Sequence, residues 1–93
     1  MVIEVGNTVF FARIVPQCDI YETLELTVRT ANSDNGYFIG VDSKGTKQAY
    51  PFIRDNVGSL IFSNEVEAKK VVKEAKKKYG MRKLTKVTEG EDE

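Results

Sequence analysis

The segment from Gly58 to Ala68 constrains the fold of this chain more than any other, because a short apolar strand pattern leads almost directly into a helix start. The residues before it are rich in β-branched and aromatic side chains separated by turn residues, which is typical of strands. Ser63 or Asn64 can cap the helix, and with Asn64 as N-cap, Glu67 occupies the third helical position of a capping box. The segment therefore predicts a β region that ends here and one helix that begins here.

Five short strands are predicted ahead of that helix. The second alternates apolar and polar side chains over residues 20–29, with Glu22 as the one polar residue on the apolar side, and its length predicts a bend. Pro51 cannot donate to a ladder, which predicts an edge strand or a bulge. Asn35-Gly36 and Gly45 supply turn residues that tolerate positive φ. The predicted strands cover residues 8–14, 20–29, 37–42, 47–54 and 59–62.

The order of these elements predicts an α+β fold that is mainly β. We expect a small five-stranded antiparallel barrel or a strongly bent sheet, followed by one amphipathic C-terminal helix. Gly80 is the predicted helix end, so residues 1–80 form one domain and residues 81–93 an extension. In that extension, residues 81–87 are compatible with a short strand and residues 88–93 with a disordered acidic tail. The helix is expected to dock through an apolar stripe of Ala68, Val71, Val72, Ala75 and Tyr79.

Catalytic and metal-binding side chains are scarce. The 93 residues include no His and one Cys, Cys18, which excludes a Ser–His or Cys–His pair, a disulfide within the chain and a zinc site built from this chain alone. Asp19, Glu22 and Glu25 lie close in sequence, but Glu22 and Glu25 point to opposite faces of a regular strand. We therefore expect no enzyme activity and no cofactor.

Charge is distributed unevenly, although 14 Lys and Arg residues balance 14 Asp and Glu residues. Residues 64–83 contain eight basic and three acidic side chains, whereas residues 84–93 contain one basic and four acidic ones. No apolar run approaches the roughly 18 residues of a membrane span, and the first residues lack the basic and apolar regions of a secretory signal. We expect a cytoplasmic protein without a membrane segment.

Two short motifs carry a resemblance to a known class of proteins. Residues 5–11, VGNTVFF, resemble an opening strand of the form G-D-x-V-Y-F, and residues 58–68, GSLIFSNEVEA, resemble a strand-to-helix step of the form G-x-x-V-F-x-x-x-x-E-A. Over most of residues 5–79 the chain is similar to uncharacterised small proteins of bacteriophages, prophages and other mobile elements of Gram-positive bacteria. This resemblance implies a small SH3-like barrel with a C-terminal helix and implies no activity. Asn7 departs from the Asp of the first pattern, and Val66 stands at the helix start where such sequences often have Glu. Neither change affects the implied fold.

Aromatic and arginine side chains on the predicted strands form the first candidate site. Small barrels use an aromatic and basic platform to bind peptides or single strands. The alternative is that several of these rings fill the core, and Pro51 leaves the direction of its two neighbours open. The candidate partner-binding residues are Tyr21, Arg29, Tyr37, Tyr50, Phe52 and Arg54.

The lysines of the helix form the second candidate site. Contacts to phosphates are largely electrostatic, so closely spaced lysines can bind nucleic acid. The alternative is the solvated outer face of an amphipathic helix, on which pairs such as Lys70 and Glu74 dilute the positive charge. The candidate nucleic-acid-binding residues are Lys69, Lys70, Lys73, Lys76 and Lys77.

These observations favour a non-enzymatic binding module or adaptor, encoded by a phage or related element, that docks a host or phage protein through edge strands and loops. The alternative is a nucleic-acid-binding barrel that uses the Lys-rich helix and the arginines. A third possibility is a structural component of a virion or an oligomer. The sequence specifies neither the partner nor the oligomeric state.

Overall fold

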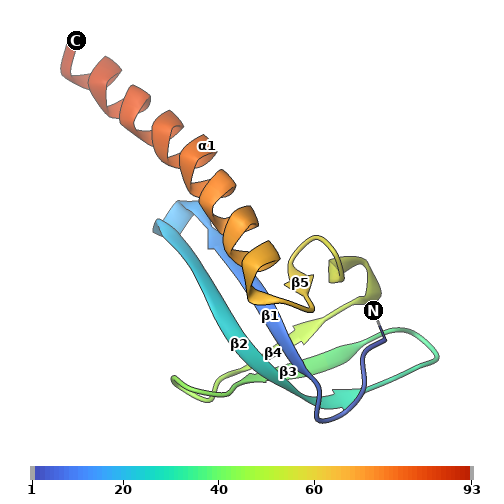
Figure 1. Ribbon diagram of the computed structural model, residues 1–93. Helices are drawn as coiled ribbons and strands as arrows, with labels where there is room; N and C mark the ends of the chain where they lie inside the picture. Colours follow the sequence, from blue (N-terminus) through green and yellow to red (C-terminus); the bar gives the residue numbers. More distant parts are fainter. Residues whose placement is uncertain (1, 93) are drawn as a thin grey trace.

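Five antiparallel strands followed by one long helix make up the computed structural model (Figure 1), which confirms the α+β, mainly β prediction. The structure describes the backbone of residues 2–92 and the side chains of residues 2–80. The strands are β1 (Thr8–Val15), β2 (Ile20–Ala31), β3 (Phe38–Asp42), β4 (Ala49–Phe52) and β5 (Ile61–Phe62). Helix α1 spans Glu65–Asp92, and short 3-10 turns occupy Pro16–Cys18 and Arg54–Asn56.

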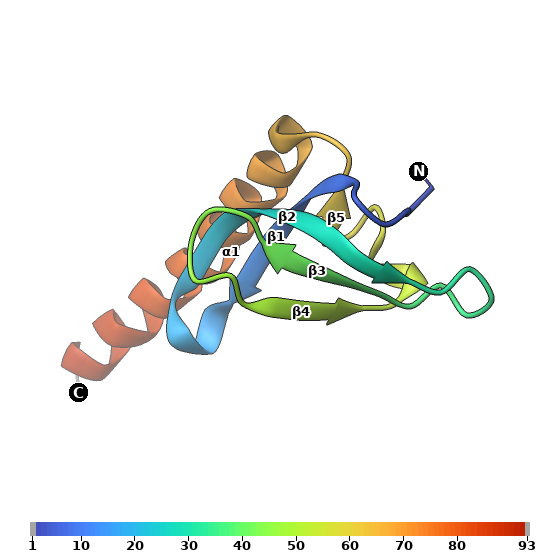
Figure 2. The same ribbon diagram turned by 90° about the horizontal axis from the view of Figure 1, so that it is seen from below.

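The sheet has the strand order β4-β3-β2-β1-β5 and is strongly bent without closing into a barrel (Figure 2). Within residues 2–92, β4 pairs with β3, β5 pairs with β1, and no ladder joins β4 to β5. The prediction of a closed barrel is therefore wrong, and the alternative of a bent sheet is observed. The physical reason is strand length, because β4 has four residues and β5 two, too few for the continuous ladder that closure requires. Pro51 lies on the edge strand β4, as predicted.

The ring of Phe11 on β1 holds the bend together. It packs against two rings of β4, although β2 and β3 separate these strands in the sheet. The ring centroids lie 5.4 Å from Tyr50 and 4.9 Å from Phe52, and Phe52 in turn stacks on Phe38 at 5.2 Å. These contacts require β1 and β4 to face each other across the inside of the bend. The buried residues of this inner core are Val9, Leu26, Val28, Phe38, Phe52 and Ile61.

Gly40 on β3 leaves room for the middle of this core. A Cβ atom at that position would lie 3.0 Å from Cδ1 of Leu26 and 3.1 Å from its Cβ. Leu26 is fully buried, so its side chain occupies the space above the Gly40 backbone. The missing side chain thus lets the sheet bend tightly around Leu26.

Arg13 and Glu22 account for the polar residue on the apolar side of β2. The two residues are opposite each other in the β1–β2 register, and Nη1 of Arg13 donates to Oε1 of Glu22 at 2.8 Å. Both side chains are partly exposed near the end of the β1–β2 hairpin. The hydrogen bond to Glu22 raises the pKa of Arg13 above its ordinary value. Arg13 therefore supplies the hydrogen-bond donor that Glu22 needs at the rim of the inner core.

Helix α1 covers the outer face of β1 and β2 (Figure 1), and the outer face of β3 and β4 lies apart from it. Ala68 is fully buried, and Val71 and Val72 pack beside it, which confirms the first three residues of the predicted docking stripe. Ala75 and Tyr79 are half-buried. The Glu67 amide donates to Oδ1 of Asn64 at 2.9 Å, so Asn64 is the N-cap. The small side chain of Ala68 lets the helix approach the sheet closely. The residues of this second cluster are Ala12, Phe62 and Ala68, with Phe10, Ile14, Val71 and Val72 against them.

The helix is longer than predicted. Its backbone continues through Gly80 to Asp92, so the predicted helix end at Gly80 is wrong. Residues 81–87 are helical and do not form the strand that the sequence allowed. Gly80 costs a helix about 1 kcal/mol relative to Ala and does not end it here. The far end of the helix projects beyond the sheet and gives the molecule extents of 53 × 25 × 22 Å (Figure 1). A separate extension that begins at residue 81 stays a prediction.

Replacing Phe11 by Ala should destabilise the protein by about 2–4 kcal/mol, because it removes the ring that joins β1 to β4 and leaves a cavity beside Phe52. Urea unfolding followed by circular dichroism measures the change. Val5→Ala is the matched control, since the Val5 side chain is 65 % exposed and its truncation should change stability by less than about 0.5 kcal/mol. Equal stability of the two variants would show that the bend does not depend on Phe11.

Candidate functional site

The outer face of the β3–β4 hairpin is apolar. Strand alternation turns Phe38, Gly40 and Asp42 of β3 inward, so the residues between them point outward. The register pairs Ile39 with Pro51 and Val41 with Ala49. Tyr37 and Ile53 extend the same two rows, and their side chains are 56 % and 45 % exposed. We call Tyr37, Ile39, Val41, Ala49, Pro51 and Ile53 the hairpin face.

The composition of the hairpin face is unusual for a surface that meets only water. An antiparallel sheet commonly packs one face on the core and turns polar side chains to solvent on the other. The hairpin face has apolar or aromatic side chains at all six positions and no charged one. Four of the six residues are exposed, whereas Ile39 and Val41 are half-buried. Contiguous apolar patches that remain open to solvent mark interaction sites. The hairpin face is therefore the strongest candidate for a binding surface.

A hollow of about 700 Å³ lies at one end of the hairpin face. Tyr37, Ile39, Pro51 and Ile53 contribute to its wall, together with residues at the end of β2. Its volume falls within the range of roughly 300–1,000 Å³ that is usual for ligand pockets, and its lining is mainly apolar. The hollow can accept one or two apolar side chains of a partner.

Asparagine side chains fix the loop that carries Tyr37. Oδ1 of Asn32 accepts a hydrogen bond from the Asp34 amide at 2.9 Å, and Oδ1 of Asn35 accepts one from the Tyr37 amide at 2.9 Å. The Asn32 amide donates to the Tyr37 carbonyl at 2.8 Å and closes the hairpin. Side-chain bonds of this type stabilise tight turns without a packed core. Tyr37 is thus held at a defined position although its ring is exposed.

Arg54 lies beside Tyr37. A Cβ atom at Gly36 would come within 2.7 Å of both Cβ and Nε of Arg54, which places the arginine side chain across the Gly36 backbone. Gly36 also has a φ of +75°, so two conditions favour glycine there. Arg54, Tyr37 and Val57 share the wall of a second hollow of about 320 Å³. Among the side chains of residues 2–80, Arg54 has no ion pair with an acidic residue.

Asp42 organises the loop between β3 and β4. Its carboxylate accepts hydrogen bonds from the Lys44 and Gly45 amides, each at 3.0 Å, and these bonds, with that of Gly45 the largest effect, lower the pKa of Asp42. The predicted left-handed conformation of Gly45 is wrong, and Lys47 adopts it instead with φ 58°. Gly45 is required by contact, because a Cβ atom there would lie 2.6 Å from Oδ2 of Asp42.

The aromatic and basic side chains predicted as one platform lie on different parts of the molecule. Tyr50 and Phe52 point into the bend, where Phe52 is buried and Tyr50 is half-buried. Tyr21 pairs with Ile14 on the face that α1 covers, and burial, with nearby Asp19 and Tyr79, raises its pKa. Arg29 is exposed at the bulge in β2. Tyr37 and Arg54 are the two predicted residues that the structure brings to one surface.

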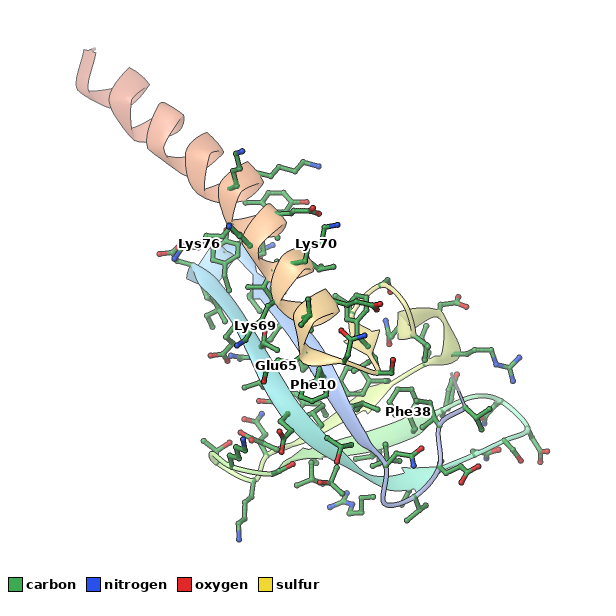
Figure 3. All side chains as sticks on the ribbon, in the orientation of Figure 1. Phe10, Phe38, Glu65, Lys69, Lys70 and Lys76 are labelled. Atoms are coloured by element: carbon green, nitrogen blue, oxygen red, sulfur yellow. The ribbon has the colours of Figure 1, made fainter. Side chains whose placement is uncertain are left out.

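The predicted lysine set is exposed along α1. Lys69, Lys70, Lys73, Lys76 and Lys77 all lie outside the stripe that packs on the sheet. Figure 3 shows Lys69 next to Glu65 at the start of the helix, with Lys70 and Lys76 further along. Nζ of Lys69 lies 3.0 Å from Oε1 of Glu65. The structure therefore separates the lysines from the hairpin face.

Sequence reasoning missed most of the hairpin face. In the segment Phe38–Asp42, apolar residues occupy both alternating positions, so periodicity does not identify the inner side. Gly40 and Asp42 are the residues that identify the inner side of β3. Gly40 leaves room for Leu26, and the Asp42 carboxylate binds a loop amide, so both lie inside the bend.

Comparisons with protein-family models, curated proteins and solved structures find no match to this chain. Among the side chains of residues 2–80, no group of three or more Cys, Asp and Glu residues is arranged to hold a metal ion. In the same part of the chain, no helix has the length and apolar character needed to cross a membrane. The geometry of the hairpin face and of α1 is therefore the evidence on function.

Replacing Asp42 by Ala should lower the thermal midpoint at pH 7, because the Lys44 and Gly45 amides lose their acceptor. Since the folded-state pKa of Asp42 is lowered, its contribution to stability is present above the unfolded-state pKa of about 4 and is lost as the pH falls through the folded-state value. Thermal melts of both proteins between pH 7 and pH 2 should therefore converge at the acid end. A constant difference in thermal midpoint at every pH would contradict a stabilising role of the ionised Asp42 carboxylate. Asp34→Ala, in the exposed β2–β3 loop, is the control.

Proposed function

We propose that this chain is a non-enzymatic binding module that docks another protein through the hairpin face. The observation that carries the proposal is the row of six apolar or aromatic side chains on the part of the sheet that lies apart from α1 (Figure 2). Contact with a partner would remove this surface from water, which stabilises a complex by about 25 cal/mol per Å² of apolar area before the costs of association.

The partner is proposed to lie on the hairpin face rather than to pair with the edge of β4. The Asp42 amide donates to the Gln48 carbonyl at 2.9 Å, and hydrogen-bonded pairs alternate along an antiparallel ladder. Ala49 and Pro51 therefore turn their backbone groups away from β3, and Pro51 has no amide hydrogen to donate. The missing donor at Pro51 weakens the pairing of an added strand with the edge of β4. Contact with side chains of the face is favoured over the edge-strand pairing that the sequence suggested.

The chemistry of the partner follows from the hollow and from Arg54, both of which adjoin Tyr37. The hollow of about 700 Å³ favours an apolar side chain, because Ile39, Pro51 and Ile53 line it. Arg54, held against Gly36 beside Tyr37, favours a carboxylate, because no acidic side chain within residues 2–80 pairs with it. The proposed ligand is a protein segment that presents an apolar residue and an acidic residue close together.

The wider biological assignment is also a proposal. The return of β5 to pair with β1 in a bent five-stranded meander supports an SH3-like relationship. The opening-strand and strand-to-helix motifs support an adaptor encoded by a phage or related mobile element, with a host or phage protein as partner in the host cytoplasm. The absence of His from the sequence supports a role without catalysis.

The test begins with capture of partners from host lysate on the tagged protein, followed by titration calorimetry with each captured protein after purification. The double variant Tyr37→Lys with Ile53→Lys should weaken the dissociation constant by about tenfold or more, since both side chains are exposed and line the hollow of the face. The matched control is Val5→Lys with Val66→Lys, two exposed valines outside the face. The control should change the dissociation constant by less than about twofold.

Three outcomes would overturn the proposal. The first is that no captured protein binds the purified wild type. The second is that the control weakens binding as much as the face variant does. The third is a concentration-dependent dimer in light scattering that the face variant abolishes, which would assign the hairpin face to a second copy of this chain.

A further inference from the structure

Lysines occupy the outer side and flanks of α1. Successive residues of an α-helix are separated by about 100°, so the stripe that includes Ala68 and Val72 faces the sheet along one side. Lys69, Lys73 and Lys76 follow an i, i+4, i+7 spacing outside that stripe and are exposed. Lys70 and Lys77 are exposed and widen the same region. Figure 3 shows Lys69, Lys70 and Lys76 along the helix. We call these five residues the lysine face.

Acidic side chains neutralise little of the lysine face. Lys69 pairs with Glu65 at 3.0 Å. The other four lysines have no ion pair among the residues whose side chains the structure describes, and the suggested partner of Lys70, Glu74, forms none with it. Four exposed ammonium groups along about two turns of helix therefore retain their full positive charge.

The acidic end of the chain lies away from the lysine face. The backbone remains helical from Lys76 to Asp92, so the first acidic residue of that end, Glu89, follows Lys76 by about 20 Å along the axis at 1.5 Å per residue. This separation exceeds the Debye length of about 8–10 Å at physiological ionic strength. The helix thus prevents the acidic end from folding back over the lysines of the same chain.

We propose that the lysine face binds the phosphate backbone of double-helical DNA without sequence specificity. Ammonium groups on a rigid helix match the closely spaced phosphates of a duplex, and the attraction requires no base contacts. A single strand is a poorer fit, because single-strand sites use exposed rings for stacking and the lysine face contains none. Insertion into a lipid surface is disfavoured, since the apolar side of α1, including Ala68 and Val71, is packed on the sheet.

The experiment measures fluorescence anisotropy of a labelled 20-base-pair duplex of arbitrary sequence, titrated with the full chain at 50–200 mM salt. With about four phosphate contacts, the slope of log K against log salt should be about −3.6, so the affinity should fall roughly 150-fold across that range. Two duplexes of unrelated sequence should bind with equal affinity. Flat salt dependence, or no binding at 50 mM salt, would overturn the proposal.

The decisive variant is Lys70→Gln with Lys73→Gln and Lys77→Gln, which removes three unpaired charges and keeps residues of similar helix propensity. It should reduce the magnitude of the salt slope by about 2.7. The matched control is Arg29→Gln with Lys44→Gln and Lys47→Gln, which removes three exposed charges from the β2–β4 region. It should leave the slope within about 0.5 of the wild type. Circular dichroism verifies that both variants fold.

Two further results would contradict the proposal. One is an equal loss of DNA affinity in the lysine variant and the control, which would indicate attraction to overall charge. The other is lysine-dependent binding to vesicles that contain phosphatidylserine without any binding to DNA, which would assign the lysine face to an anionic lipid surface. Retained DNA binding in the Tyr37→Lys, Ile53→Lys variant would show that this site is independent of the hairpin face.

Discussion

The contact of Phe11 with Tyr50 and Phe52 is the interaction on which the rest of the structure depends. A flat sheet of this strand order would leave β1 and β4 separated by two strands, yet these rings meet at 4.9–5.4 Å. Curling the sheet around them creates an inside, where Leu26 and Phe38 are buried, without the closure of a barrel. A small domain of 93 residues gains one core in this way from strands as short as two residues.

The bend also decides which surfaces remain free. Helix α1 covers the outer side of β1 and β2, because the second cluster, centred on Ala12 and Ala68, lies there. The outer side of β3 and β4 turns away from the helix (Figure 2). Its apolar side chains are exposed or half-buried. The lysines lie on the outer side and flanks of α1. Two chemically different surfaces therefore result from one packing arrangement.

Local alternation, turn residues and helical spacing predicted the five strands and the docking stripe of α1. The missing amide hydrogen of Pro51 predicted an edge strand or a bulge, and β4 is an edge strand. Closure of the sheet was not predictable in this way, since it depends on how far β4 and β5 extend. The inward direction of Asp42 depends on hydrogen bonds to loop amides that form only after the hairpin closes. The arrangement of the predicted aromatic and basic residues was not predictable for the same reason. Tyr50 pairs with Gly40 and Phe52 pairs with Phe38 on the inner face, and no local pattern distinguishes this arrangement from its opposite.

The rigid attachment of α1 to the sheet has a geometric consequence. The helix and the hairpin belong to one packed unit, and only Ser63 and the N-cap Asn64 lie between β5 and α1. A protein docked on β3–β4 and a duplex bound by α1 would therefore keep one fixed orientation relative to each other. With both proposed ligands bound, the chain would set the angle between them as well as their proximity.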